Sequence, residues 1–180
     1  MLSLKGFVEI EGYGVFEDTT FREVVDMVEW LRDVANNSEN REKYHKIGLY
    51  FGQDINFFHH EARSLQKLTS MKCPFTPVLY SSRIVASGRH TDDLGIVSVF
   101  YITEVVMSRI SGVTLGKFLG GKLTRSEVFP VNIPDIAIQT TVVEMYNILQ
   151  RQYHATIFDK HADNVMIDKN RRLWLVDFEF

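Results

Sequence analysis

Hydrophobic residues recur every three or four positions in three stretches of the chain, Thr19 to Asn36, Gln53 to Met71 and Asp135 to Tyr153. This spacing is the period of an α-helix with one apolar face. In the first stretch, Thr20 and Glu23 have the spacing of a capping box, which marks where a helix begins. The pattern therefore predicts three amphipathic helices that each pack one face against a core.

Between these stretches the apolar runs are short and predict strands. Lys5 to Phe16 reads as two strands around a glycine turn, and Lys43 to Phe51 as one strand. Val78 to Ala86 predicts another strand, followed by a turn at Ser87 to Asp93. Gly95 to Ile110 is longer than an ordinary strand, so we expect two strands or a bend there. Strands and helices in this order predict an α+β fold.

The end of the chain has the pattern of a short β-hairpin. Two apolar runs, Val165 to Ile167 and Leu173 to Val176, flank a polar turn from Asp168 to Arg172. A hairpin of this size brings its entry and its exit together. We therefore expect Asn164, just before the first strand, to face Asp177, just after the second.

Acid and amide side chains gather around this predicted hairpin. Asp159 precedes Asn164 by five residues and would lie on the loop above it. Together with Asp177 these residues offer two carboxylates and one amide carbonyl. Oxygen ligands of this kind suit Mg²⁺, which binds one or two carboxylates together with the phosphates of a nucleotide. The pattern predicts a magnesium and nucleotide site.

Composition narrows the class of protein. The chain has 180 residues, of which 45% are hydrophobic and 24% charged, as is typical of a globular domain. Its net charge of −3 gives no electrostatic footprint for nucleic acid or for an anionic membrane. A single cysteine, Cys73, is typical of a reducing compartment, and no apolar run approaches the length of a membrane span. We expect a cytoplasmic protein without a signal peptide, with no nucleic acid or membrane partner.

The order of these features resembles the protein-kinase-like fold, in which D-x-x-x-x-N is followed by a hairpin and then D-F-G. Asp159 to Asn164 resembles the catalytic loop, and Asp177-Phe178-Glu179 the metal-binding motif. The D-x-H-x-x-N form, with His161 in the middle, is closest to the aminoglycoside phosphotransferases and related small-molecule kinases. The resemblance extends from residue 46 to residue 180.

This resemblance implies a two-lobed α+β fold and binding of ATP and Mg²⁺. Residues 1–110 would form an N-lobe with an antiparallel sheet, an inserted helix at 19–36 and a helix at 53–71 that corresponds to helix αC of kinases. Residues 111–180 would form a truncated helical C-lobe with a short helix at 114–121 and the catalytic hairpin. The implied activity is transfer of the γ-phosphate to a hydroxyl of a protein or a small molecule.

The resemblance also implies a role for each matching residue. Lys46 would hold the nucleotide phosphates and Glu61 would orient Lys46. Asp159 would accept the proton of the acceptor hydroxyl, while Asn164 and Asp177 hold the metal. The alternative for Lys46 and Glu61 is an ordinary exposed ion pair, which contributes only about 0 to 1 kcal/mol.

Two further sets of residues match the nucleotide site of this family. Met107 would back the adenine, and the backbone of Ser108 and Ile110 would bond to its edge; a core strand followed by a glycine turn fits the same residues. Gly12 and Gly14 would place backbone N–H groups against phosphate. A tight hairpin needs the same glycines, and on sequence alone that interpretation is favoured.

Three departures from the family pattern leave a second function open. Ile157 replaces the histidine two residues before the catalytic aspartate, Glu179 replaces the glycine of D-F-G, and the later C-lobe helices are not part of the 180 residues. The alternative is a catalytically degenerate kinase fold (pseudokinase) or an effector-like interaction module, which would act in a host cytoplasm. A third hypothesis is a homo-oligomer in which a second copy covers the truncated lobe at Asp135 to Tyr153.

Overall fold

A computed structural model describes residues 7–10, 13–37, 42–119, 135–155, 157 and 160–178. The chain forms two compact units, described separately below. The first contains residues 1–59 and 79–108, and the second residues 60–78 and 109–180. The division falls two residues before the predicted boundary at 110, and the helix predicted at 53–71 contributes to both units.

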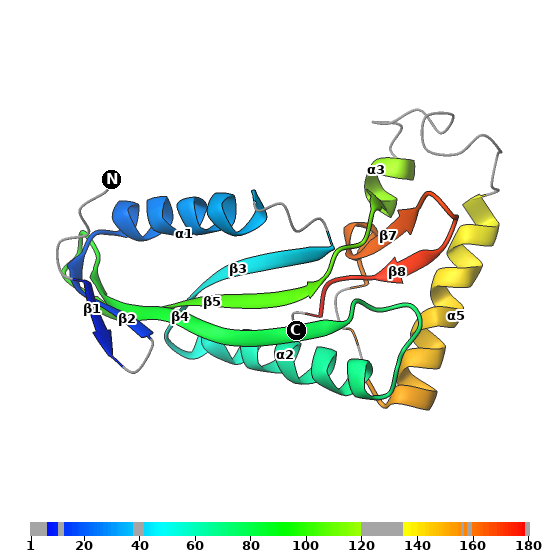
Figure 1. Ribbon diagram of the computed structural model, residues 1–180, viewed down its shortest axis with the longest axis horizontal. Helices are drawn as coiled ribbons and strands as arrows, with labels where there is room; N and C mark the ends of the chain where they lie inside the picture. The colour runs from blue at the N-terminus through cyan, green and yellow to red at the C-terminus, as the bar shows by residue number, and fades with distance from the viewer. Residues whose placement is uncertain are drawn as a thin grey trace. The chain divides into compact units, whose positions relative to one another are not determined.

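The first unit is built on a five-stranded sheet in the order β1-β2-β4-β5-β3 (Figure 1). Its strands are β1 (Phe7–Ile10), β2 (Tyr13–Thr19), β3 (Lys43–Phe51), β4 (Leu79–Thr91) and β5 (Val97–Ser108). Neighbouring strands are antiparallel except β2 and β4, which run parallel. The predicted sheet is therefore present, but it is mixed rather than purely antiparallel.

The long hairpin of β4 and β5 corrects two predictions. Residues 87–91 of the expected turn are part of β4, and the chain reverses after them at Asp92, where Gly95 N–H donates to the Asp92 carbonyl over 2.9 Å. The stretch expected to break into two strands is the single strand β5. Continuous pairing explains both results, because β5 has β4 on one side and β3 on the other along most of its length.

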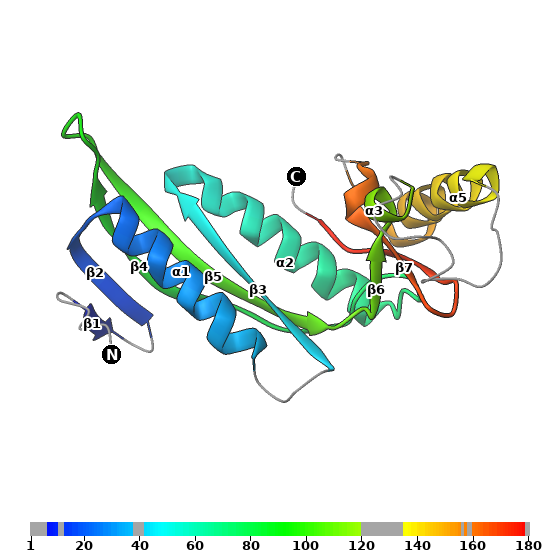
Figure 2. The same ribbon diagram turned by 90° about the horizontal axis from the view of Figure 1, so that it is seen from above.

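Helix α1 (Phe21–Asn36) covers one face of this sheet (Figure 2). The predicted capping box is present: Thr20 Oγ1 accepts from Glu23 N–H over 3.3 Å, and Glu23 Oε2 accepts from Thr20 N–H over 2.8 Å. The side chains that pack between helix and sheet form the apolar core of the unit. They are Val24, Met27, Val28, Ile47, Ala86, Phe100 and Ile102.

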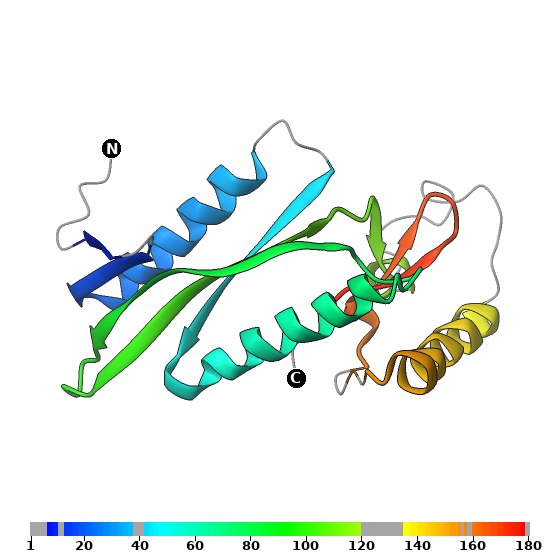
Figure 3. The same cartoon turned by 60° about the horizontal axis from the view of Figure 1, so that its bottom comes forward.

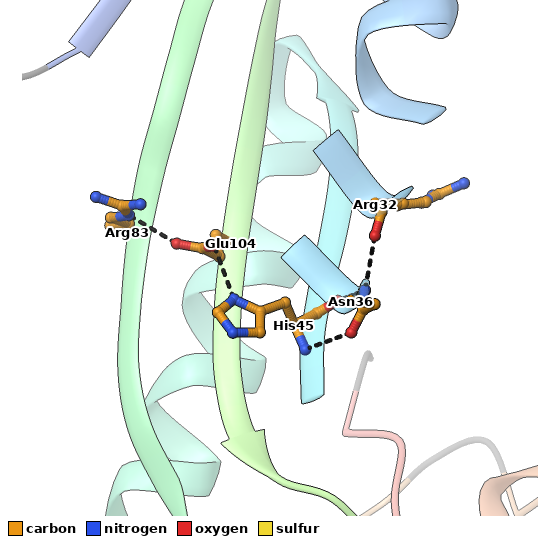
Figure 4. Close-up of polar contacts among 5 residues, drawn as sticks. All are labelled: Arg32, Asn36, His45, Arg83 and Glu104. Atoms are coloured by element: carbon orange, nitrogen blue, oxygen red, sulfur yellow. Dashed lines mark hydrogen bonds and ion pairs between the residues drawn. The ribbon is translucent and has the colours of Figure 1, made fainter. Parts of the chain in front are cut away.

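Polar side chains of α1 also close the outer edge of β3 (Figure 4). The Asn36 amide accepts from His45 N–H over 3.1 Å and donates to the His45 carbonyl over 3.0 Å, as a residue of a neighbouring antiparallel strand would do. One turn earlier, Arg32 donates to the Ile47 carbonyl over 3.1 Å. The helix therefore bonds part of an edge that would otherwise be open to strand pairing.

A buried carboxylate ties the three strands beside this edge. Glu104 on β5 accepts from His45 Nδ1 on β3 over 3.0 Å and from Arg83 Nε on β4 over 2.7 Å (Figure 4). Its side chain is 10% exposed. Burial raises the pKa of Glu104, but the hydrogen bonds from His45 and Arg83 outweigh it and hold the pKa below its ordinary value. The charged carboxylate thus stabilises the alignment of the three strands.

The helix predicted at 53–71 is present as the 3₁₀ turn η1 (Gly52–Asp54) and α2 (Ile55–Ser70). Leu65 and Leu68 on its apolar face are fully buried, whereas Phe57 is 42% exposed. In the first unit, Phe58 lies 6.4 Å from the ring of Tyr50 on β3. Glu61, which belongs to the second unit, is fully buried.

The second unit contains a three-stranded antiparallel sheet in the order β6-β7-β8. Its strands are β6 (Gly112–Thr114), β7 (Val165–Asp168) and β8 (Leu173–Leu175), and its helices are α3 (Leu115–Leu119) and α5 (Asp135–Tyr153). The predicted hairpin and the predicted helix at 135–153 are both present. Buried apolar side chains come from every part of the unit, among them Phe118, Leu149, Ile167, Leu175 and Phe178.

Candidate nucleotide and metal site

The hairpin of β7 and β8 provides the rigid base of the candidate site (Figure 3, orange and red). Val165 pairs with Leu175 and Ile167 with Leu173. These four side chains share one face of the hairpin, and Val165, Ile167 and Leu175 are buried. The alternation of buried and half-buried residues on β7 explains why this short polar-flanked sequence folds as a hairpin.

Asp168 fixes the turn between the two strands. Its carboxylate accepts from the backbone N–H groups of Asn170 and Arg172, over 2.8 and 3.0 Å, and from Trp174 Nε1 over 3.0 Å. Burial raises the pKa of Asp168, but the hydrogen bond from Trp174 and those from the two backbone groups hold it below its usual value. The charged Asp168 carboxylate, which accepts these three hydrogen bonds, therefore sets the register of the hairpin.

At the open end, the hairpin brings Asn164 and Asp177 together. Val176 N–H donates to the Asn164 carbonyl over 3.0 Å, which adds one bond beyond the last paired strand residues. Asp177 follows Val176 directly, and the side chains of Asn164 and Asp177 are both half-buried. The register places Val176 opposite Asn164, with Asp177 one residue further along the chain, and a shared site of the Asn164 and Asp177 side chains stays a prediction.

An amide oxygen and a carboxylate at neighbouring strand ends fit the oxygen ligands that Mg²⁺ prefers. A third protein ligand was not expected here, because Mg²⁺ keeps water and phosphate oxygens in its coordination shell. Within the described residues, no group of three histidine, cysteine, aspartate or glutamate side chains could hold a metal by itself. The donor set of Asn164 and Asp177 therefore fits a metal that is shared with a ligand.

Asp159, the expected proton acceptor, lies outside the described residues. Residues on either side of it are anchored in the second unit. Ile157 is 2% exposed, and Lys160 Nζ lies 5.4 Å from the centre of the Tyr146 ring on α5. Where the family pattern has a histidine, this chain thus has an apolar side chain that anchors the loop in the core.

Asp163, next to Asn164, was not singled out by the sequence pattern. In the 3₁₀ turn η2 (Ala162–Asn164), the Asp163 carboxylate accepts from Thr114 Oγ1 over 3.2 Å, and Asn164 N–H donates to the His161 carbonyl over 3.0 Å. Asp163 also lies against Gly116, where a Cβ would overlap its Oδ1 atom. The segment that carries Asn164 is therefore docked on the start of α3. The sequence signal for this contact is Thr114 followed by Gly116, because the hydroxyl of one and the missing side chain of the other accommodate the Asp163 carboxylate.

Lys46 and Glu61 belong to different units. Lys46 is half-buried on β3, opposite Val105 of β5. Glu61 lies on the part of α2 that belongs to the second unit, and its complete burial excludes the interpretation of an exposed surface glutamate. Buried carboxylates in proteins are paired or hydrogen-bonded. The pairing of Glu61 with Lys46 stays a prediction.

The residues assigned to adenine binding lie where β5 ends. Met107 is 3% exposed and stands opposite Tyr44 and Leu79 in the sheet, and Ser108 is the last residue of β5. Ile110 follows in the second unit. These positions agree with a strand that leads from one unit into the next, and the contact with adenine stays a prediction.

The sheet does not bring Gly14 and Lys46 together. Gly14 pairs with Ala86, Ala86 with Ile102 and Ile102 with Leu49, so Gly14 lies three strands away from β3. With a strand spacing of about 4.8 Å and about 3.3 Å per residue, Gly14 and Lys46 are roughly 17 Å apart. Gly12 lies outside the described residues. Phosphate binding by Gly12 and Gly14 stays a prediction, without support from this arrangement.

Comparisons with known proteins give distant structural neighbours only. No family model and no curated protein sequence matches the chain. Among solved structures, the chain is similar to WbdD, described as a bifunctional kinase-methyltransferase, and to WbdD bound to a kinase inhibitor. The TM-scores are 0.48 and 0.49 at 15–17% identity, over 76% of this chain.

The chain spans only 27–28% of those WbdD chains. At these values, neither the activity nor the ligands of WbdD carry over to this chain.

None of the described helices is long and apolar enough to cross a bilayer.

Proposed function

We propose that this chain is an ATP- and Mg²⁺-dependent phosphotransferase that transfers the γ-phosphate to a hydroxyl of a protein or a small molecule. The observation that carries the proposal is the hydrogen bond from Val176 N–H to the Asn164 carbonyl, at 3.0 Å. It supports the proposal because it brings the backbone of Asn164 next to the residue that precedes Asp177, in the sequence context of a kinase-like catalytic loop.

In this proposal, Asn164 and Asp177 hold Mg²⁺, which neutralises charge on the nucleotide phosphates. The hairpin contributes preorganisation, because the Asp168 turn and the buried Val165–Leu175 pair fix the distance between the two strand ends before any ligand arrives. Fixed ligands avoid the cost of ordering flexible side chains on binding.

Asp159 acts as the proton acceptor of the attacking hydroxyl, and Lys46, oriented by Glu61, neutralises negative charge on the phosphates. Met107 backs the adenine, and the backbone of Ser108 and Ile110 bonds to its edge.

The test measures phosphate release or transfer from radiolabelled ATP by wild type, Asp159→Ala and the control Asp26→Ala, an exposed aspartate on α1. Loss of a general base typically lowers the rate about 10²- to 10⁴-fold. We expect that loss in Asp159→Ala with nucleotide binding retained, and wild-type rates in Asp26→Ala. Equal turnover in all three proteins would refute the assignment of Asp159.

The second candidate is a kinase fold that binds nucleotide or a partner protein without turnover. The replacement of the family histidine by Ile157 is the feature that favours it. Nucleotide binding that depends on Asp177, without any turnover in the wild type, would establish this second function instead of the first.

A further inference from the structure

The second unit contains a pocket of about 420 Å³ at the turn end of the β7–β8 hairpin. Its walls come from Pro74 and Phe75, from α5 and from the hairpin itself. All these residues belong to the same unit. The volume lies in the range of about 300 to 1,000 Å³ that is typical of sites for small molecules.

Most of the pocket wall is apolar. Ile138 and Met145 of α5 and Ile167 of β7 are each at least 94% buried, since their exposed fractions are 3%, 6% and 1%. Phe75 adds an aromatic ring whose other contact is the ring of Tyr153, 6.2 Å away between centroids. The three buried side chains leave little surface to a ligand, and the apolar surface open to water comes from the half-buried Phe75 and Leu173 and the exposed Pro74 and Ala137. A ligand body that replaces water against this surface would therefore be apolar.

Two arginines lie at one end of this wall. Arg171 and Arg172 both line the pocket and are both exposed, and no carboxylate is among the lining residues. The chain as a whole carries a net charge of −3, so this positive end is a local feature. An anion is the complementary group for a pocket end of this kind.

The turn holds both arginines in place. Asp168 accepts from the backbone N–H of Arg172, and Arg171 N–H donates to the Asp168 carbonyl over 3.0 Å. The Arg172 guanidinium donates to the Pro74 carbonyl over 3.3 Å and lies 5.0 Å from the centre of the Trp174 ring. These two contacts hold the guanidinium beside Pro74, another lining residue, and leave it further N–H donors for a ligand.

Arg171 has a φ of 64°, a left-handed backbone that arginine seldom adopts. In the described part of the chain, its guanidinium makes no hydrogen bond or ion pair. A left-handed residue is ordinary in a short hairpin turn, and here that residue carries a cation that lines the apolar pocket.

We propose that this pocket binds a small amphiphilic acid, a molecule with an apolar chain or ring and one carboxylate or phosphate. The apolar part lies against Pro74, Phe75 and Ala137, and the anion pairs with Arg171 and Arg172. Guanidinium groups bind both anions through paired N–H donors. The site is independent of the proposed phosphotransferase activity, because Asn164 and Asp177 lie at the opposite end of the hairpin, about 13 Å away along β7.

The test uses octanoate as the probe and the methyl group of Met145 as the reporter. The chain has six methionines, and of these only Met145 lines the pocket. We expect octanoate, kept below its micellar concentration, to shift the ¹³C-methyl resonance of Met145 saturably, while Met27 in the core of the first unit stays in place. Met145→Leu assigns the resonance. Octan-1-ol and acetate, which each lack one half of the ligand, should bind at least tenfold more weakly.

Two variants separate the pocket from general effects of charge. Arg171→Asn removes the cation and keeps a residue that tolerates the left-handed backbone, and Lys169→Asn is the matched control from the same turn, outside the pocket. We expect octanoate to bind at least tenfold more weakly to Arg171→Asn and unchanged to Lys169→Asn. Ala137→Phe, which fills the pocket, should abolish the shift.

An unmoved Met145 resonance, equal affinity for octanoate and octan-1-ol, or equal affinity of the two turn variants would each overturn the proposal. Circular dichroism of each variant checks that it is folded. Because the reporter is a resonance and not turnover, the result does not depend on whether the chain transfers phosphate.

Discussion

Val176 and Asn164 share a backbone hydrogen bond of 3.0 Å that closes the open end of the β7–β8 hairpin. The bond carries the pairing one step beyond Val165 and Leu175, the last pair of strand residues. As a result, the chain leaves the hairpin at Asp177 beside the residue through which it entered, Asn164. Val176 and Asn164, separated by twelve positions in sequence, are thus neighbours across the hairpin.

Gly112, the first residue of β6, and Gly116 in α3 should differ in how well they tolerate alanine. A Cβ on Gly112 would overlap the backbone carbonyl of Ile167, which is fixed in the β6–β7 pairing, whereas one on Gly116 would meet the side-chain end of Asp163. Asp163 is 58% exposed and can rotate away. We expect Gly112→Ala to lower the free energy of unfolding by about 1 to 3 kcal/mol, and Gly116→Ala by less.

Urea denaturation of the two alanine variants measures this difference. If Gly116→Ala were the more damaging of the two, the contact between Gly112 and the β7 backbone would not be as close as described.

Asn36 should protect the edge of β3. Asn36→Ala removes both hydrogen bonds to the backbone of His45, so we expect a loss of about 1 to 3 kcal/mol in the free energy of unfolding. It also uncovers backbone groups of an edge strand, which promotes association between copies. Denaturant unfolding and light scattering follow the two effects. The neighbouring Asn37→Ala, at an exposed helix end, is the matched control and should change neither.

Glu104 should make stability depend on pH. Its pKa is lowered in the folded state, so its contribution is present above the ordinary value of 4.5 and is lost as the pH falls through the folded-state pKa. Glu104→Gln should be less stable than wild type by about 1 to 3 kcal/mol at neutral pH. The difference should narrow below pH 4.5.

Unfolding curves at several pH values check this dependence. The exposed Glu29→Gln on α1 serves as control and should stay close to wild type. A difference between Glu104→Gln and wild type that is the same at every pH would show that the charge of Glu104 does not stabilise the strands.

The parts of the fold that sequence predicted well are those with local signals. The capping box at Thr20 and Glu23 located the start of α1, and the apolar runs around Asp168 predicted the hairpin. The amphipathic pattern also gave α5 its bounds at Asp135 and Tyr153. In each case the interactions that define the element lie within a few residues of one another.

The features that sequence did not predict depend on long-range pairing. Ser87 and Gly88 have turn propensity, but pairing with Tyr101 and Phe100 keeps them in β4. No pattern in the neighbouring residues predicts the parallel pairing of β2 with β4. This pairing places Gly14 far from Lys46 in the sheet. Asp163 was missed for the same reason, because its partner Thr114 is 49 residues away in sequence.

Calorimetric titration of ATP, with and without Mg²⁺, into wild type and Asp177→Asn tests the central claim most directly. Asp168→Ala is not a suitable control, since Asp168 holds the turn; Asp26→Asn, on the first unit, is. We predict ATP binding that Mg²⁺ strengthens in wild type and in Asp26→Asn, and that loses this Mg²⁺ dependence in Asp177→Asn. Equal ATP binding by all three proteins with and without Mg²⁺, or no binding at all, would contradict a metal and nucleotide site at the end of the hairpin.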